Sequence, residues 1–184
     1  PAPSGAAYTE FDSNDYNSLP HNLRKMGYRT AAFQGTYGPF WNSLIMHRRL
    51  GFEKDYSRNT FPSGEIIGLG LSDRAIFSQA LKVLAQMQNP FYAFVVTLSS
   101  HHPFDFEGLD DGTLALPRGL KGTLVGNYLL SIRYFDREFG RFVDGLRKEN
   151  LLDKSLIVVY GDHPAIPGEC SHELPILQSG RATF

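Results

Sequence analysis

Apolar positions recur at helical spacing in several stretches of the chain. The clearest pattern alternates steps of four and three residues and predicts a helix that ends near Asn150; its apolar members are Tyr128, Ile132, Phe135, Phe139, Phe142 and Leu146. A second helix is predicted from a Ser72–Asp73 cap to the Asn89–Pro90 pair. A shorter helix is predicted after a Ser18 cap, and it ends at Gly27.

Three candidate strands alternate with these helices, and the second and third are continuous apolar runs. They cover residues 28–34, 91–98 and 156–160, and β-branched and aromatic side chains are frequent in them. The last run has the sequence LIVVY and predicts a fully buried strand. Because helices and strands alternate along the chain, we expect an α/β fold with a mostly parallel central sheet and helices on both faces.

The segments between these elements are rich in glycine, proline and polar residues. Residues 1–14 are expected to form an arm or loop ahead of one partial domain that covers residues 15–184. Residues 53–70 show no periodicity and are expected to form a long connection, and residues 105–122 a second loop. No long element is predicted after His163.

Composition narrows the classes of partner. The 184 residues include 18 basic and 19 acidic side chains without a basic stripe, so we expect no nucleic-acid partner. No run approaches the ~20 apolar residues that cross a bilayer, so membrane contact is expected only through segments absent from this chain. The single cysteine, Cys170, excludes an internal disulfide, and the oligomeric state is not indicated. Because the sequence does not begin with methionine, we expect a processed or excised chain.

Polar residues follow each of the three predicted strands. Gln34 ends the first strand, the Ser99–His102 group follows the second, and Asp162–His163 follows the third. Any one of these stretches is more typical of a solvated loop than of a functional site. Because ligands bind outside the carboxyl ends of the strands in open α/β sheets, we expect the three stretches to converge on one site.

Metal-assisted transfer of a phosphate or sulfate ester is the chemistry that suits this group. Asp162 and His163 supply a carboxylate and an imidazole, which are ligands for Mn²⁺, Mg²⁺ or Zn²⁺. His101 or its neighbour His102 could contact or protonate an ester oxygen, because imidazole titrates near neutrality. Trp41, the only tryptophan, could form the wall of a substrate pocket or part of the core. Three tail residues are further candidates, although each is more typical of a solvated segment: Glu169, His172 and Glu173.

Four blocks within residues 15–163 carry a family resemblance. They are SLPHNLRKMGYRTAAFQG, FWNSLIMHRRLGFEKDY, NPFYAFVVTLSSHHPF and YFDREFGRFVDGLRKENLLDKSLIVVYGDH. With this spacing the chain resembles lipoteichoic acid synthase and related phosphoglycerol transferases, which belong to the sulfatase and alkaline phosphatase superfamily. The resemblance implies a sulfatase-like fold, present here in part. It also implies an extracytoplasmic location, at the cell surface or in the periplasm, and a membrane-anchored parent protein.

The resemblance also implies roles for individual residues. It implies a divalent metal, Mn²⁺ in the first place, held in part by Asp162 and His163. His101 matches the family's His-x-Pro-aromatic motif and is expected to act at the glycerol phosphate group, with His102 beside it in the substrate site. Trp41 matches a tryptophan of the family's substrate pocket.

Departures from the family pattern qualify the expected activity. Gln34 and Ser43 occupy substrate-binding places where the family has a histidine and an arginine, so two cationic partners for a phosphate are lost. The family's nucleophilic threonine and a glutamate ligand lie further upstream, and Thr9 is too close to Gln34 to replace the threonine.

The expected function follows from both the matches and the departures. We expect part of the catalytic domain of a metal-dependent phosphoglycerol transferase of the cell envelope, which acts on a phosphoglycerol-type lipid or glycan and is inactive as this chain alone. Two alternatives remain open. One is a sulfatase or a phosphoethanolamine transferase, and the other is a non-catalytic binding or structural module on the same fold.

Overall fold

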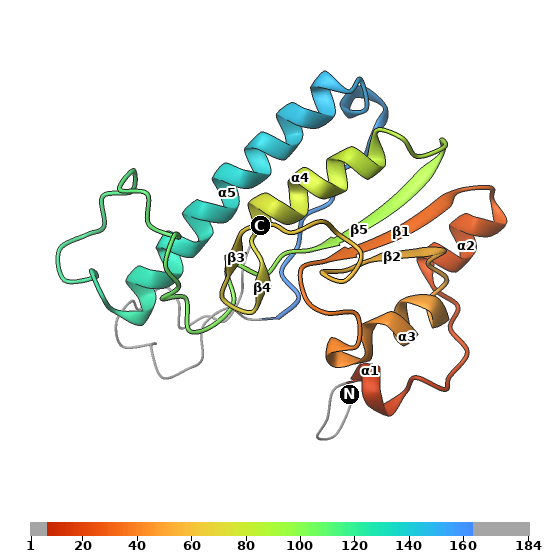
Figure 1. Cartoon of the computed structure of the whole chain (residues 1–184), viewed down its shortest axis with the longest axis horizontal. Coiled ribbons are helices and arrows are strands. Elements are labelled where there is room, and N and C mark those ends of the chain that lie inside the picture. Colours follow the sequence, from red (N-terminus) through yellow and green to blue (C-terminus); the bar gives the residue numbers. More distant parts are fainter. Residues whose placement is uncertain (1–6, 164–184) are drawn as a thin grey trace. The chain divides into compact units, whose positions relative to one another are not determined.

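A three-stranded parallel sheet organises the first part of the molecule. The computed structural model describes residues 7–163, which fall into two compact units that divide after Leu98 (Figure 1). In the first unit the strands lie in the order β2 (Lys54–Tyr56), β1 (Arg29–Gln34), β5 (Phe91–Val96), and both pairs are parallel. The prediction of a parallel α/β sheet is confirmed.

Helices cover both faces of this sheet. α2 (Leu19–Lys25) leads into β1, α3 (Ser43–Arg49) connects β1 to β2, and α4 (Asp73–Leu84) precedes β5. β2 lies on one side of β1 and β5 on the other, so the two connections cross the sheet in opposite directions. Right-handed crossovers then place α3 and α4 on opposite faces, as Figure 1 shows. A short helix, α1 (Ala7–Glu10), lies in the segment expected to be an arm or loop.

The helix ends follow the predicted caps. The Ser18 hydroxyl accepts a hydrogen bond from the His21 N–H at 3.3 Å, and Ser72 accepts one from the Ala75 N–H at 3.2 Å. Gly27 follows α2 with a φ of +88°, a conformation that costs glycine little. Short-range sequence signals therefore determine where these helices begin and where α2 ends, whereas α4 ends at Leu84, ahead of the predicted stop at Asn89–Pro90.

The core of the first unit is built on β1. Ala31, Ala32 and Phe33 are 0% exposed, and Phe33 stacks on Tyr56 with ring centroids 5.0 Å apart. Burial of one such ring stabilises the fold by roughly 1.5–3 kcal/mol. All six residues of β5 are only half-buried, because β5 pairs with β1 on one side and with no other described strand.

The expectation that residues 53–70 form only a long connection is wrong. The segment contains β2 and the first strand of a hairpin, β3 (Ile66–Ile67), which pairs with β4 (Gly70–Leu71). The hairpin is held against the end of β1, since the Leu71 N–H donates to the Gly35 carbonyl at 3.0 Å. Strands of two or three residues are too short to produce a periodic pattern.

The second unit is dominated by the long helix α5 (Leu124–Lys148). Its N-cap is Thr123, whose hydroxyl accepts from the Gly126 N–H at 3.1 Å. Of the six apolar positions that the four-three spacing predicted, Phe142 and Leu146 are buried and Ile132 is 38% exposed, and the buried face also includes Val125 and Tyr134. The α-helices in residues 7–163 include none that is long and apolar enough to cross a bilayer.

The prediction of a buried strand at residues 156–160 is wrong for the described structure. Within residues 7–163 this segment pairs with no strand, and Leu156 is 90% exposed. Apolar, β-branched composition favours a strand only where a neighbour offers backbone hydrogen bonds and a surface to pack on. Four residues discussed above lie outside the described residues: Glu169, Cys170, His172 and Glu173.

Candidate functional site

A buried polar network lies at the carboxyl end of β1. The side chain of Gln34 donates from Nε2 to Asp55 Oδ1 at 3.3 Å. Its Oε1 accepts from the hydroxyls of Ser43 at 2.9 Å and Thr36 at 3.2 Å. Gln34 and Ser43 are 5% and 6% exposed, so their polar groups are satisfied inside the protein. Both residues were predicted to bind substrate, and that role stays a prediction.

Asp55 joins the network to a buried histidine. Its second oxygen, Oδ2, is bonded to His47 Nδ1, and the two side chains are 5% and 2% exposed. The His47 ring packs edge-on against Tyr8, Phe52 and Phe94 at centroid distances of 6.1, 5.5 and 6.2 Å. No periodic pattern in the sequence points to this pair, because Asp55 lies in the segment that was expected to be a connection.

The loop above this network presents Trp41 to solvent. Trp41 is 60% exposed and contacts Phe40 edge-on at 6.0 Å. Trp41 and Asn42 both adopt the left-handed backbone conformation, with φ of 52° and 57°. That conformation costs about 1–2 kcal/mol for Trp41, whereas asparagine adopts it more readily, and such strain clusters at functional sites. Of the two readings of Trp41, the exposed position excludes the core.

Side-chain hydrogen bonds hold the strained loop in place. Asn42 Nδ2 donates to the Tyr8 carbonyl at 2.8 Å and to Asp12 Oδ2 at 3.0 Å. The Ser43 hydroxyl also lies 2.8 Å from the Phe40 carbonyl and 3.1 Å from the Gly38 carbonyl, so one proton serves three acceptors. The loop is therefore supported from below by Gln34 and from the side by α1.

A cavity of about 420 Å³ opens beside the network. His47 and Asp55 lie in its wall together with polar and cationic residues that include Arg48, Lys54 and Asn59. A cavity of this size, lined largely by polar and charged side chains and next to a loop with an exposed aromatic side chain, is suited to a small polar ligand such as a polyol ester.

The second unit contains the two predicted histidines of the Ser99–His102 group. His101 Nδ1 lies 2.7 Å from the His102 carbonyl, and because a carbonyl only accepts, Nδ1 carries the proton. Nε2 of His101 is then the ring nitrogen that can accept a proton from a ligand or act as a base. The His102 ring packs edge-on against Phe104 at 5.7 Å. Phe104 in turn contacts Tyr128, and burial raises the pKa of the Tyr128 phenol above 10.0.

Asp162 and His163 lie next to one another in the second unit. Asp162 Oδ1 and His163 Nε2 are 3.6 Å apart, and the side chains are 84% and 66% exposed. Two donors at this separation can contact one divalent cation, since each metal–ligand bond is about 2.0–2.2 Å long. In residues 7–163, no three side chains of the types His, Cys, Asp and Glu are grouped closely enough to hold a metal.

The predicted site residues thus fall into two groups. One group, with Trp41, lies in the first unit, and the other, with His101 and Asp162, lies in the second. That the two groups share one site stays a prediction.

Comparison with known proteins gives consistent matches. A family model described as Sulfatase matches residues 3–182. Lipoteichoic acid synthase 1 of Bacillus subtilis (strain 168) is 33% identical over 168 residues, and lipoteichoic acid synthase of Staphylococcus aureus (strain USA300) is 32% identical over the same length. Each match covers 89% of this chain and 26% of the relative, so the chain spans about a quarter of the length of these proteins.

Solved structures agree with these matches. The lipoteichoic acid synthase LtaP from Listeria monocytogenes superposes with a TM-score of 0.79 at 31% identity, over 90% of this chain and 42% of that one. An alkaline phosphatase superfamily protein from Vibrio parahaemolyticus superposes with a TM-score of 0.66 at 20% identity, over 90% of this chain and 42% of that one. The second match shows the fold alone, and it agrees with the parallel sheet described above.

Proposed function

The chain belongs to the sulfatase family, and from that premise we propose that it forms part of the catalytic domain of a metal-dependent phosphoglycerol transferase of the cell envelope. The observation that supports this most is the 32–33% identity to lipoteichoic acid synthases over 168 residues. On this proposal the substrate is a phosphoglycerol-type lipid or glycan, and the location is extracytoplasmic.

Trp41 is the proposed substrate platform. An exposed indole offers a flat apolar surface for the carbon skeleton of a glycerol unit. The strained backbone and the Gln34–Ser43 support beneath it keep the ring in one position, which lowers the entropy cost of binding. Because Gln34 and Ser43 are uncharged, this part of the site contacts the polyol portion of the substrate rather than its phosphate.

His101 is the proposed proton-transfer residue. Its Nδ1–H donates to a backbone carbonyl, so Nε2 is the atom available to an ester oxygen. His102 lies beside it in the proposed substrate site. Asp162 and His163 would hold a divalent cation, Mn²⁺ on the proposal, with Mg²⁺ and Zn²⁺ as alternatives. A bound cation of this kind neutralises charge on the ester and activates a nucleophile.

Replacement of Trp41 by alanine is expected to weaken binding of glycerol phosphate about tenfold, or about 1.4 kcal/mol, through loss of the aromatic contact. Calorimetric titration of the intact chain measures the affinity, and Trp41→Phe should recover part of it. Met26→Ala is the control, because Met26, the C-cap of α2, is similarly exposed, at 71%. Equal affinities for all the variants would contradict the proposed role of Trp41.

Mn²⁺ is expected to bind this chain more weakly than micromolar, because two protein donors leave most of the coordination shell to water. We therefore propose that the chain alone does not carry out transfer. Calorimetric titration with Mn²⁺ measures the affinity, with Asp162→Ala as the test variant and Asp144→Ala, also exposed, as the control. A stoichiometric micromolar site that is lost only in Asp162→Ala would show the expectation to be wrong.

A binding module without catalysis is the second candidate function. The internal hydrogen bonds of Gln34 and Ser43 favour it, because they commit both side chains to structure. Turnover of a phosphoglycerol, sulfate or phosphoethanolamine ester by the metal-loaded chain would exclude a module and would also identify the ester class.

A further inference from the structure

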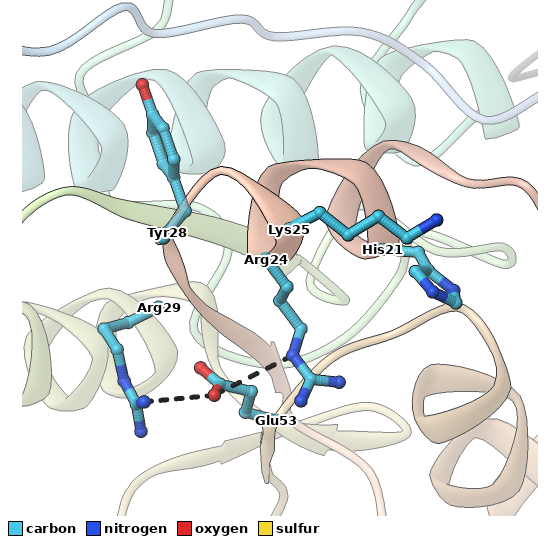
Figure 2. Close-up of a pocket in the computed structure, with 7 residues that line it drawn as sticks. His21, Arg24, Lys25, Tyr28, Arg29 and Glu53 are labelled. Atoms are coloured by element: carbon cyan, nitrogen blue, oxygen red, sulfur yellow. Dashed lines mark ion pairs between the residues drawn. The ribbon is translucent and has the colours of Figure 1, made fainter.

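A second, cationic pocket lies at the opposite end of β1 from Gln34. Its volume is about 360 Å³, and it is formed where α2 turns into β1. Figure 2 shows Arg24 and Arg29 extending toward Glu53 from the two sides, with Lys25 and His21 along the helix. The lining residues are His21, Arg24, Lys25, Gly27, Tyr28, Arg29 and Glu53.

Glu53 holds the two guanidinium groups together. Its Oε1 lies 3.1 Å from Arg29 Nη1 and 3.8 Å from Arg24 Nε, so both arginines meet at one carboxylate oxygen. Its Oε2 accepts the backbone N–H of Thr30 at 3.0 Å, which fixes the carboxylate. A guanidinium has five N–H donors, and Glu53 contacts Arg24 and Arg29 through one nitrogen each, at ion-pair distance, so further donors remain for a ligand.

The charge of the pocket is strongly positive for this chain. Arg24, Lys25 and Arg29 carry three positive charges against the single carboxylate of Glu53, whereas the whole protein has a formal net charge of −1. Basic residues in the last turn of a helix are common, because they favour the helix dipole, and this accounts for Arg24 and Lys25. It does not account for Arg29, which belongs to the strand.

The floor of the pocket is open to a ligand. Gly27 turns the chain with a φ of +88°, and a Cβ built on it would meet no atom within 4 Å. Its conformation favours glycine, and Gly27 is exposed where it lines the pocket. The arginines themselves are about half-exposed, at 46% and 48%.

We propose that this pocket binds the phosphate group of a phosphate ester. Two guanidiniums that share one carboxylate present N–H donors in the fork geometry that matches phosphate oxygens, and Lys25 adds a point charge beside them. His21 contributes a further positive charge when it is protonated. Phosphate is preferred over carboxylate because it has more oxygens to satisfy several donors at once.

The site is separate from the proposed substrate platform. β1 has six residues, which span about 17 Å at a rise of about 3.3 Å per residue, and the pocket and Gln34 lie at opposite ends. A phosphate bound here is therefore not the ester that reacts at the carboxyl end of the sheet. The pocket suits a phosphate of a longer glycerol phosphate chain, and that choice of source rests on the proposed function.

A flat anionic membrane is disfavoured as the ligand. The exposed apolar residues here are Leu19, the first residue of α2, and Met26, its C-cap; they are seven positions apart and so fall on one side of the helix. At about 100° per residue, Arg24 and Lys25 lie roughly 140° and 240° around the helix from Leu19. One planar surface cannot contact the apolar and the basic residues together.

Binding of phosphate esters to the intact chain tests the proposal. Glycerol 1-phosphate and a short glycerol phosphate oligomer are titrated into the wild type and into the double variant Arg24→Gln with Arg29→Gln, while backbone amide NMR shifts are followed. We expect shifts at Gly27 and Arg29 in the wild type and an affinity loss of about tenfold or more in the variant. The control is Arg49→Gln with Lys82→Gln, which removes the same charge from exposed positions of α3 and α4 outside both cavities and should change the affinity less than twofold.

The outcomes separate this proposal from its rivals. Equal losses in the two double variants would show a general charge effect and overturn it, as would binding only to anionic lipid vesicles. Tighter binding of the oligomer than of glycerol 1-phosphate would show that the bound phosphate belongs to a glycerol phosphate polymer. Equal binding would show that the pocket recognises a single phosphate ester. Trp41 fluorescence reports independently on the substrate platform, so failure of one proposal leaves the other measurable. Circular dichroism confirms that each variant is folded.

Discussion

Replacing Asp55 by alanine should lower the free energy of unfolding by about 3–5 kcal/mol. The carboxylate accepts from Gln34 Nε2 and is bonded to His47 Nδ1, and all three side chains are at most 5% exposed. Its loss leaves two buried donors without their acceptor, and each costs about 1–3 kcal/mol. Native domains are stable by only about 5–15 kcal/mol, so this one change removes a large fraction of the total.

Denaturant unfolding, followed by the fluorescence of the single tryptophan, measures this effect in the unit where it occurs. Asp144→Ala is the matched control, because Asp144 forms an exposed ion pair with Arg147 and should change stability by less than about 1 kcal/mol. His47→Leu combined with Asp55→Leu should cost less than Asp55→Ala alone, because only Gln34 then loses a partner. If Asp55→Ala lowered the free energy of unfolding by no more than Asp144→Ala does, the buried network would contribute no stability.

The same substitution should loosen the substrate platform. Asp55 positions Gln34, and Gln34 Oε1 accepts from Ser43 beneath the strained Trp41–Asn42 backbone. Strain of this kind persists only where the surrounding structure enforces it. We therefore expect the Trp41 emission of Asp55→Ala to shift before global unfolding.

Gly126→Ala should destabilise the second unit by about 3 kcal/mol. A Cβ at this position would lie 1.8 Å from the Leu120 carbonyl oxygen and 2.8 Å from its carbon. Both atoms belong to the backbone, so relief requires the first turn of α5 to move away from the preceding turn. That movement also disturbs the Thr123 cap, whose hydroxyl accepts from the Gly126 N–H.

Gly140→Ala is the matched control in the same helix. A Cβ there would meet no atom within 4 Å, and the position is exposed. Since glycine is less favourable than alanine in a helix, this variant should gain about 0.5–1 kcal/mol. Thermal unfolding by circular dichroism, which reports on the 25 residues of α5, should give midpoint shifts of opposite sign. Similar shifts of the same sign would contradict the close contact at Gly126.

Short-range sequence signals predicted the starts of two helices and most of a third. The Ser18 and Ser72 hydroxyls cap helices at the predicted places, and the apolar spacing of residues 128–146 predicted most of α5. These signals act within one or two turns, so they require no knowledge of the rest of the fold. The strand β2 was missed because Lys54–Tyr56 is three residues long and gains its structure from pairing with β1.

At residues 156–160 a strand was predicted that the described structure lacks, and the reason is again that strand formation depends on pairing. Their apolar composition is typical of a buried strand, yet within residues 7–163 they pair with no strand, and Leu156 is 90% exposed. A helix satisfies its own backbone hydrogen bonds, whereas a strand depends on a neighbour that its own sequence does not specify.

The sequence by itself determined the family, the parallel α/β architecture and Trp41 as a candidate for the site, because motifs and periodicity are properties of neighbouring residues. Only the tertiary structure decided that Gln34 and Ser43 are buried partners of one another and that Asp55 and His47 lie beneath the loop of Trp41. The reason is register: β1 pairs with β2 so that Ala32 lies beside Asp55, and this brings Gln34 within reach of a carboxylate 21 positions away. Such contacts depend on how strands align in space, which no local pattern records.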